Sequence, residues 1–364
     1  MICLLLALAA GVPAEASDTT LADAWVDYRT TYVADDGRVI DRGAEDRTTS
    51  EGQAYAMIRA VWADDRATFT RVRDWTTVNL QGGDAGRLPA WVWGRRSDGI
   101  WGVIDPAPAS DADQWMAWAL VGAARTWGQP AWEAEARTLL GRIWVEETRE
   151  IAGKRYLLPG PWAQTQAPVQ LNPSYWLPFA WRDFARVDTA HDWNALLEPA
   201  YAAFEQCRTS SGLVPDWCWM QANDGAVIAA PRGQEAHDDF GFEAMRVPWT
   251  LAAEVRWHKD RRAQRLLVPY GDLATRWKES GSLPAILTPE GRARVEWESL
   301  AMLGGLLPAW GLLHPDLAKR MWTQDIQPQR GAHGWGPPTD YYAQNWVWFG
   351  YALWSGAART WSMP

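Results

Sequence analysis

Long hydrophobic runs are absent from this 364-residue sequence, and so is any block rich in lysine or arginine. A helix that crosses a bilayer needs about 20 apolar residues, and no run reaches about 18, so we expect no membrane insertion. Acidic residues outnumber basic ones by 44 to 35, and the formal net charge is −9. Nucleic acid and anionic membrane surfaces are therefore poor partners, because both attract basic proteins.

Cysteine and histidine are also scarce. The chain has three Cys and five His, with neither a C-x-x-C nor an H-x-x-x-H spacing. Zinc sites are commonly built from such spacings, so the sequence predicts no metal centre. It contains no G-x-S-x-G elbow and no glycine-rich phosphate-binding loop. We therefore expect an activity that needs no cofactor.

Residues 1–16 have the features of a signal peptide. Ile2 to Ala10 is apolar, and Ala14-Glu15-Ala16 forms a small-x-small cleavage site, although no basic residue precedes the apolar run. The sequence thus predicts a periplasmic or secreted protein whose residues 17–364 form a single domain.

Export permits disulfide bonds. Only Cys207 and Cys218 remain after removal of the signal peptide, and Ser210 to Gly212 between them offers a turn. A disulfide and a pair of buried thiols both fit this pattern, and the sequence leaves the choice open.

Tryptophan, in contrast, is abundant, with 28 of 364 residues. Its large ring fills hydrophobic cores, and its flat face also stacks on the apolar faces of sugars. We expect both uses here, a core rich in tryptophan and a glycan-binding cleft.

Helical periodicity dominates the chain. Ala54, Met57, Ile58, Val61 and Trp62 follow the i, i+3, i+4, i+7, i+8 spacing of an amphipathic helix. Similar stretches lie near residues 20–33, 66–80, 116–127, 131–147, 176–186, 192–207, 248–258, 260–278, 294–312, 314–324 and 340–360. About a dozen helices and few strand-like runs indicate an all-α fold. An (α/α)6 barrel of six helical hairpins fits this number, and an α-solenoid is the alternative.

Two acidic positions at predicted helix starts stand out. Glu51 lies in the first turn of an amphipathic helix, where a negative charge is favourable in any protein. Ser110 and Asp113 have the spacing of a capping box, which leaves Asp111 between them unexplained.

A third acidic position, Glu243, precedes a helix that we expect to begin at Pro248. Arg246 is one turn away, and the simple interpretation is a surface ion pair of little energetic value. In a barrel of helical hairpins, however, the inner helices run parallel, so Glu51, Asp111 and Glu243 would meet at one mouth. Glycoside hydrolysis needs such carboxyl groups, one to protonate the leaving oxygen and one to act on water or the anomeric carbon.

The segment from Ala109 to Trp127 resembles the signature of family 8 glycoside hydrolases, A-[ST]-D-[AG]-D-x-x-[IM]-A followed by small, apolar and aromatic positions. The Ser-Glu-Gly-Gln-x-Tyr run from Ser50 is similar to the general-acid segment of that family. Further similar segments are Leu88–Gly94, Asn172–Trp176, Gly212–Trp217 and Tyr341–Tyr342. The resemblance extends from about residue 20 to 360, and it is strongest to the endoglucanases encoded beside bacterial cellulose synthases.

This resemblance implies an (α/α)6 barrel with an open cleft and an inverting endo-hydrolase of β-1,4-glucan (cellulose). It makes Glu51 the general acid, has Asp111 bind and distort the sugar, and has Tyr175 and Arg246 orient the reaction centre. The partner is then a polysaccharide, with the cellulose synthase complex as a further candidate, and we expect a monomer. The tryptophans in or near the matching segments, which we expect to bind substrate, are Trp91, Trp93, Trp101, Trp115 and Trp217.

One position departs from the family pattern. The usual base is an aspartate in a Tyr-Asp-Ala-x-Arg-x-Pro segment, and this chain has Phe242-Glu243-Ala244 there. Glutamate extends the carboxylate by about 1.5 Å, whereas inverting enzymes hold their carboxyl groups about 6.5–9.5 Å apart. We assign the base to Glu243, with Asp238 and Asp239 as less favoured candidates. The alternatives are the same fold acting on chitosan, xylan or mixed-linkage glucan, and a catalytically weak glucan-binding protein.

Overall fold

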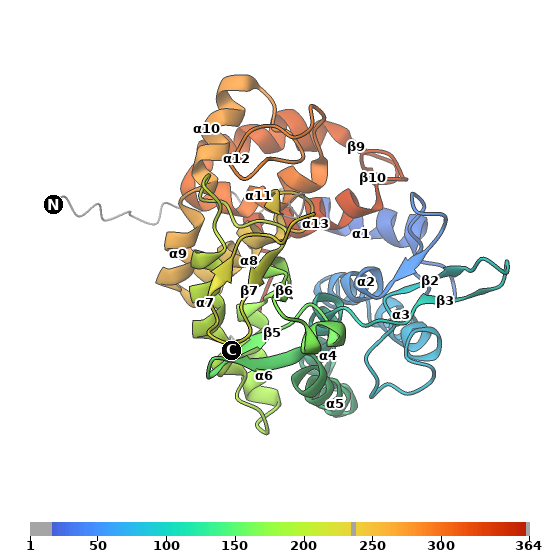
Figure 1. Ribbon diagram of the computed structural model, residues 1–364. Coiled ribbons are helices and arrows are strands. Elements are labelled where there is room, and N and C mark those ends of the chain that lie inside the picture. Colours follow the sequence, from blue (N-terminus) through green and yellow to red (C-terminus); the bar gives the residue numbers. More distant parts are fainter. Residues whose placement is uncertain (1–16, 234–237, 362–364) are drawn as a thin grey trace.

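The computed structural model describes residues 17–233 and 238–361 (Figure 1), so the predicted signal peptide lies outside the described residues. Its α-helices are α1 (Ser17–Tyr32), α2 (Ser50–Trp62), α3 (Arg66–Asn79), α4 (Ser110–Trp127), α5 (Pro130–Glu147), α6 (Pro178–Val187), α7 (Leu197–Gln206), α8 (Arg246–His258), α9 (Arg261–Leu267), α10 (Tyr270–Ser280), α11 (Leu300–Leu313), α12 (Pro315–Met321) and α13 (Tyr341–Ser355). Short helical turns of other types are η2 (Pro161–Thr165), η3 (Pro173–Tyr175), η4 (Trp193–Leu196), η6 (Trp322–Ile326) and η7 (Gln327–Gln329).

An inner ring is formed by α2, α4, α6, α8, α11 and α13, which pack against one another in that order. Helix α2 is buried from Gly52 to Val61, and α4 is buried from Ser110 to Ala124. Helices that are apolar on all sides belong in an interior, which explains why these helices are the inner ones. The outer helices cover them, with α3 against α2, α5 against α4 and α12 against α11. The arrangement confirms the predicted (α/α)6 barrel.

Arg59 of α2 closes the ring. Its guanidinium donates to the carbonyl of Gln344 and to Oδ1 of Asn345 on α13, both at 3.2 Å. It also lies 3.8 Å from the ring centre of Tyr28 on α1. Arg59 is only 1% exposed, and burial lowers its pKa to about 10, so it stays charged at neutral pH.

Aromatic rings fill the inside of the ring. Trp115 of α4 packs edge-on to Tyr55 of α2 and stacks on Phe349 of α13, and Trp249 of α8 lies against both Trp115 and Phe349. Much of the tryptophan excess is therefore core, as expected.

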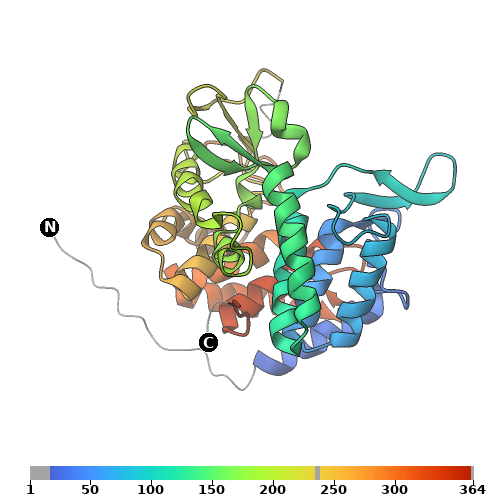
Figure 2. The same cartoon turned by 90° about the horizontal axis from the view of Figure 1, so that it is seen from below.

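The strands are short, and several of them lie at one end of the barrel, above the helices in Figure 2. They are β1 (Thr48–Thr49), β2 (Val92–Arg95), β3 (Trp101–Asp105), β4 (Thr148–Ile151), β5 (Lys154–Leu157), β6 (Val169–Leu171), β7 (Cys218–Met220), β8 (Val227–Ile228), β9 (Arg330–Gly331) and β10 (Gly334–Trp335). All pairings are antiparallel, in the orders β1-β2-β3, β4-β5, β6-β7-β8 and β10-β9. Strand β1 leads directly into α2, and the β2–β3 hairpin projects from the rim (Figure 1).

The single helix predicted for 260–278 is wrong, because the chain forms α9 and α10 instead. Pro269 lies between them and has no N–H to continue the helical hydrogen bonds. The helix predicted for 294–312 begins only at Leu300, after the hydroxyl of Ser299 caps it through the N–H of Ala301.

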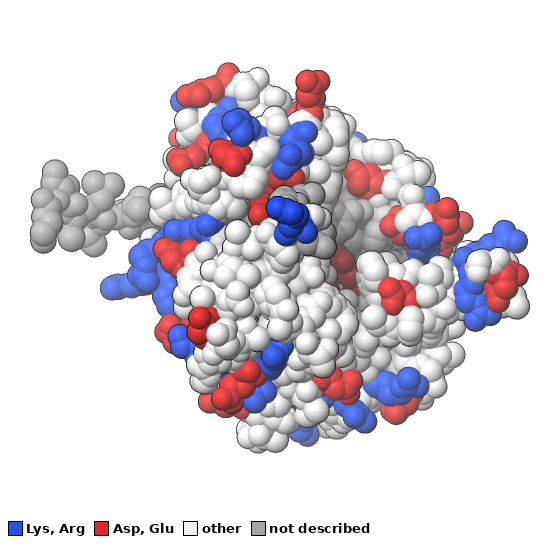
Figure 3. Space-filling view, in the orientation of Figure 1, with Lys and Arg blue, Asp and Glu red and all other residues white. Residues whose placement is uncertain are grey.

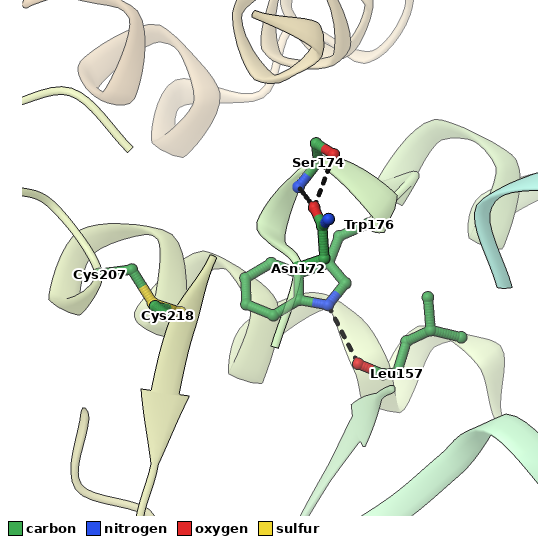
Figure 4. The surroundings of a disulfide bond; sticks show 6 residues. All are labelled: Leu157, Asn172, Ser174, Trp176, Cys207 and Cys218. Carbon is green, nitrogen blue, oxygen red and sulfur yellow. Dashed lines mark hydrogen bonds between the residues drawn. A yellow bond between two sulfur atoms is a disulfide. The ribbon is translucent and has the colours of Figure 1, made fainter. Parts of the chain in front are cut away.

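The two cysteines form a disulfide between the end of α7 and β7 (Figure 4), with the Cα atoms of Cys207 and Cys218 5.9 Å apart. This decides between the two interpretations that the sequence left open. No helix among the described residues is long and apolar enough to cross a membrane.

Candidate active site

Arg246 lies at the centre of a group of carboxylates at the mouth of the barrel. Its Nη1 is 2.9 Å from Oδ2 of Asp111 and 3.8 Å from Oε1 of Glu51. Its Nη2 donates to Oε2 of Glu243 and, at 2.8 Å, to Oγ of Ser174. The structure thus brings together the acidic residues at the starts of α2, α4 and α8. Figure 3 shows this face hollowed near its middle, with acidic side chains visible in the hollow.

Glu51 is the second residue of α2, and contacts of its neighbours fix the position of this helix start. The Thr49 hydroxyl caps the helix by accepting from the N–H of Gly52 at 3.0 Å. A Cβ atom at Gly52 would lie 2.6 Å from the hydroxyl of Tyr341, so only glycine fits there. The buried Gln53 amide bonds the N–H of Val39 and the hydroxyl of Thr76. Each residue of the Glu-Gly-Gln run therefore has a separate role.

Glu51 has the protonation behaviour of a general acid. Burial raises its pKa to about 7, Arg246 opposes this rise, and the negative charge of Asp111 adds to it. The side chain nevertheless keeps 22% of its surface exposed, so a ligand in the mouth can reach it. At neutral pH about half of the Glu51 side chains would carry a proton to donate.

Asp111 is the second residue of α4 and is buried against Arg246. The predicted capping box beside it is wrong. Ser110 lies inside the helix and donates its hydroxyl to the carbonyl of Leu158 at 2.6 Å. Asp113 is fully buried and shares a hydrogen bond with the equally buried Glu147 at the end of α5. Tertiary contacts thus take both side chains away from capping.

Glu243 lies in a tight turn that Asp216 holds from behind. Oδ1 of Asp216 accepts hydrogen bonds from the N–H groups of Gly241 and Glu243, both at 3.1 Å, and of Ala244, at 2.7 Å. Burial raises the pKa of Asp216 to about 6, although these hydrogen bonds lower it. A Cβ at Gly241 would meet the Asp216 carboxylate at 2.7 Å, which explains the glycine.

Helix α8 begins at Arg246, so the prediction that Pro248 is its first residue is wrong by two positions. The Arg246 N–H bonds the carbonyl of Glu243 at 3.1 Å, and the turn therefore continues into the helix. Proline is still accommodated, because the first N–H groups of a helix have no partner within it.

The less favoured candidates for the base make other contacts. Asp239 is bound by both arms of Arg294, at 2.6 and 2.8 Å. Asp238 lines a pocket beside the disulfide.

Aromatic rings flank the Arg246 cluster. The guanidinium lies 5.1 Å from the ring centre of Tyr175, whose ring is 6.0 Å from that of Trp217. Trp91, 45% exposed, is adjacent because its carbonyl accepts from the N–H of Ser50 at 2.9 Å. Tyr175 and Trp217 thus lie beside Arg246, and the backbone of Trp91 lies beside the start of α2.

The other predicted tryptophans lie differently. Trp93 and Trp101 stack on each other with Arg38 beside both rings, and Trp93 also meets Trp75 of the outer helix α3. The prediction that Trp115 binds substrate is wrong. Trp115 is only 2% exposed and lies in the aromatic core, so no sugar can stack on it.

Two exposed tryptophans near the site were missed by the sequence reasoning. Trp162, 42% exposed, has its ring 6.4 Å from that of Trp217. Trp297, 52% exposed, stacks on Phe242, the residue before Glu243. Neither lies in a matched segment, and exposure beside an active site leaves no signal in a single sequence.

Comparison with known proteins identifies the family of this chain. The model of the family "Glycosyl hydrolases family 8" matches residues 3–288. The chain belongs to glycosyl hydrolase family 8. An endoglucanase of Salmonella typhi is 35% identical to this family 8 chain over 266 residues, which cover 72% of the chain and 69% of that protein. An endoglucanase of Pseudomonas fluorescens is 37% identical over 232 residues, which cover 61% of the chain but only 57% of that protein.

A solved structure gives the same result for the fold. The endo-1,4-D-glucanase from Vibrio fischeri superposes on this family 8 chain with a TM-score of 0.77 and 25% identity, covering 90% of the chain and 93% of that protein. Within residues 17–233 and 238–361, no three His, Cys, Asp or Glu side chains are grouped so that they could hold a metal ion.

Proposed function

We propose that this family 8 protein is an endo-β-1,4-glucanase that hydrolyses cellulose-type glucan with inversion of configuration. One observation carries the proposal: Arg246 binds Asp111 and Glu243 and lies 3.8 Å from Glu51, whose pKa is raised to about 7. Inverting hydrolysis needs an acid and a second carboxylate. Glu51 is about half protonated at neutral pH, and Glu243 is a second carboxylate bound to the same arginine.

The proposed reaction is a single displacement. Glu51 donates its proton to the glycosidic oxygen as the bond to the anomeric carbon breaks. Glu243 accepts a proton from a water molecule, whose oxygen bonds to that carbon from the opposite face. Asp111, held by Arg246, has its second oxygen available for a sugar hydroxyl. The product is an α-anomer, because attack from the far face inverts the β-linkage.

The open arrangement of aromatic rings supports action within a chain. Trp162 contacts Trp217, which contacts Tyr175, and Trp297 stacks on Phe242. These exposed rings come from separate segments next to the reacting groups and offer stacking surfaces for more than one sugar of a chain.

A reducing-sugar assay on carboxymethyl-cellulose, chitosan, xylan and mixed-linkage glucan tests the substrate, and NMR of the first product tests the stereochemistry. We expect the highest rate on carboxymethyl-cellulose and an initial α-anomer. A faster reaction on another polymer would overturn the substrate assignment. Binding of glucan without hydrolysis would identify a glucan-binding protein instead.

We also propose export to the periplasm or exterior, supported by the disulfide and by the signal-like residues 1–16. The resemblance to glucanases encoded beside cellulose synthases makes that complex the proposed partner. Co-purification of cellulose synthase subunits with the tagged protein from its own cells tests this, and their absence after cross-linking would contradict it.

A further inference from the structure

Glu243, the glutamate at the base position, is held by specific hydrogen bonds. Three groups converge on one of its oxygens, Oε2: the guanidinium of Arg246, the amide nitrogen of Asn172 at 3.0 Å and the hydroxyl of Ser174 at 3.3 Å. All described hydrogen bonds to the Glu243 carboxylate use this oxygen. Oε1 therefore remains available to a water molecule in the mouth.

The orientation of the Asn172 amide is fixed by its neighbours. Its Oδ1 accepts from the N–H of Ser174 at 3.0 Å and from the Ser174 hydroxyl at 2.6 Å, as Figure 4 shows. Both of these partners are donors to that atom, so the other end of the amide, the NH2 group, must face Glu243. Asn172 is 1% exposed and caps η3, so it cannot turn away easily.

The single proton of the Ser174 hydroxyl distinguishes the two neutral neighbours. It points to Oδ1 of Asn172, which is nearer, at 2.6 Å, than the Glu243 oxygen, at 3.3 Å. The same hydroxyl oxygen accepts from Nη2 of Arg246 at 2.8 Å. Ser174 thus fixes Asn172 and Arg246, and Asn172 is the neutral donor to the base.

The backbone that carries Glu243 is held independently, by the Asp216 carboxylate behind the turn. A shorter side chain cannot recover its contacts by moving this backbone, because three N–H groups anchor it. The glutamate length therefore matches the distance from the anchored turn to Asn172.

We propose that Asn172 is a positioning residue that holds Oε2 of Glu243, directs Oε1 toward the attacking water, and makes glutamate the required base in this chain. The proposal rests on the function proposed above. In this proposal Asn172 acts through Glu243 and does not bind the sugar. Substitution of Asn172 should therefore lower kcat and leave KM nearly unchanged.

The decisive variant is Asn172→Asp, which keeps the size of the side chain and the acceptor for Ser174 but loses the NH2 donor. We expect kcat to fall about tenfold or more, as for a lost hydrogen bond to a charged group. The acid limb of the pH–activity profile should move to higher pH, because a donor to the ionised base has been replaced by a second acid. Asn172→Ala should lower kcat without adding that charge.

Glu243→Asp tests the length of the side chain. We expect lower activity than in the wild type, and Asn172→Ala should cost less in the Glu243→Asp background than alone, because the contact is already broken. Additive losses, or an Asp variant as active as the wild type, would overturn the proposal.

Asn345→Ala is the matched control, since Asn345 is a fully buried asparagine that binds Arg59 far from Glu243 in the chain. It should leave the pH profile unchanged even where it lowers stability. If the wild type hydrolyses glucan and both Asn172 variants keep its kcat and pH profile, the positioning role is wrong. If the wild type hydrolyses no glycan, the proposed function fails first.

Discussion

Glu51 shows how the surroundings of a side chain change its protonation. Its helix-start position favours the charged form, yet burial and Asp111 raise its pKa to about 7. Desolvation therefore outweighs the helix dipole and the attraction of Arg246. At neutral pH about half of the Glu51 side chains therefore carry the proton that the proposed general acid must donate.

Glu51→Gln should lower kcat about 10²–10⁴-fold on glucan, because the amide cannot donate a proton as an acid. Glucan binding should stay within a few-fold of the wild type, since the amide keeps the shape of the side chain. Stopped reducing-sugar assays and binding to the inactive variant measure the two effects. Glu45→Gln, at a side chain 84% exposed in the preceding loop, is the control. Near-normal turnover of Glu51→Gln would refute the assignment.

The pH profile provides a second test at the residue level. Because Glu51 works when protonated, kcat/KM should fall as pH rises through about 7. In Asp111→Asn a negative neighbour is lost, and Arg246 attracts Glu51 more strongly, so both changes lower the pKa. The alkaline limb of kcat/KM should move to lower pH, in addition to any loss of rate. A limb that stays in place or moves upward would show that Asp111 does not act on Glu51.

The first turn of α4 is an element whose stability should depend on pH. Asp113 and Glu147 are fully buried, and neither receives a donor from another group among the described residues. Burial raises the pKa of both carboxyls well above their ordinary values of 3.8 and 4.5, and the neighbours Asp111 and Glu146 raise them further. In the folded protein the two side chains must therefore share at least one proton.

Unfolding at higher pH releases this proton, because the unfolded carboxyls ionise near their ordinary values. The stabilisation is complete below about pH 4 and is lost as pH rises, by up to about 1.4 kcal/mol per pH unit for each proton. The variant Asp113→Asn/Glu147→Gln should flatten the fall of Tm with pH. Asp183→Asn, a buried carboxylate that accepts from Trp118 at 2.7 Å, is the matched control. Parallel Tm curves for wild type and double variant would contradict a shared proton.

The disulfide joins α7 to β7, which lies in the sheet beside Asn172. Cys207→Ser/Cys218→Ser should lower the free energy of unfolding by about 2–3 kcal/mol, because a closed loop with a sequence separation of 11 restricts the unfolded chain. Urea titrations with and without a reductant measure this. Reduction should reproduce the effect in the wild type and have none in the variant. An unchanged midpoint would show that the bond contributes nothing.

Most helices could be predicted from the sequence, since apolar spacing is a local feature, although the predicted start of α8 is wrong by two residues. Tertiary partners could not. Ser110 and Asp113 have the spacing of a capping box, but their side chains interact with Leu158 and Glu147 instead. Trp115 stands in the family signature and still lies in the core. Asn172 orients the base only because Ser174 turns its amide, a contact that no spacing encodes.

At the scale of the whole molecule, Arg59 joins α2 to the last inner helix. Arg59→Met should lower the free energy of unfolding by about 2–4 kcal/mol, because carbonyl and amide oxygens on α13 lose their donor inside the barrel. Chemical denaturation measures the change. Arg42→Met, at a side chain 43% exposed beside Asp46, is the surface control and should have little effect. A loss no larger than that of the control would show that the contact does not hold the ring.

The same contact joins an early segment of the chain to a late one, so it can form only after most of the chain has been made. The partners of Arg59 on α13 lie 285 and 286 residues further along the sequence. Until they are made, the Arg59 guanidinium has its aromatic partner Tyr28 on α1 but lacks its acceptors on α13, and the ring of inner helices is incomplete. Long-range contacts of this kind slow folding, because the entropy of closing the long loop is lost before the contact can form. On the proposed route of export, a chain that enters the membrane with its N-terminus first would lack this contact until Gln344 and Asn345 had passed, so the barrel and its group of carboxylates would be completed only on the far side.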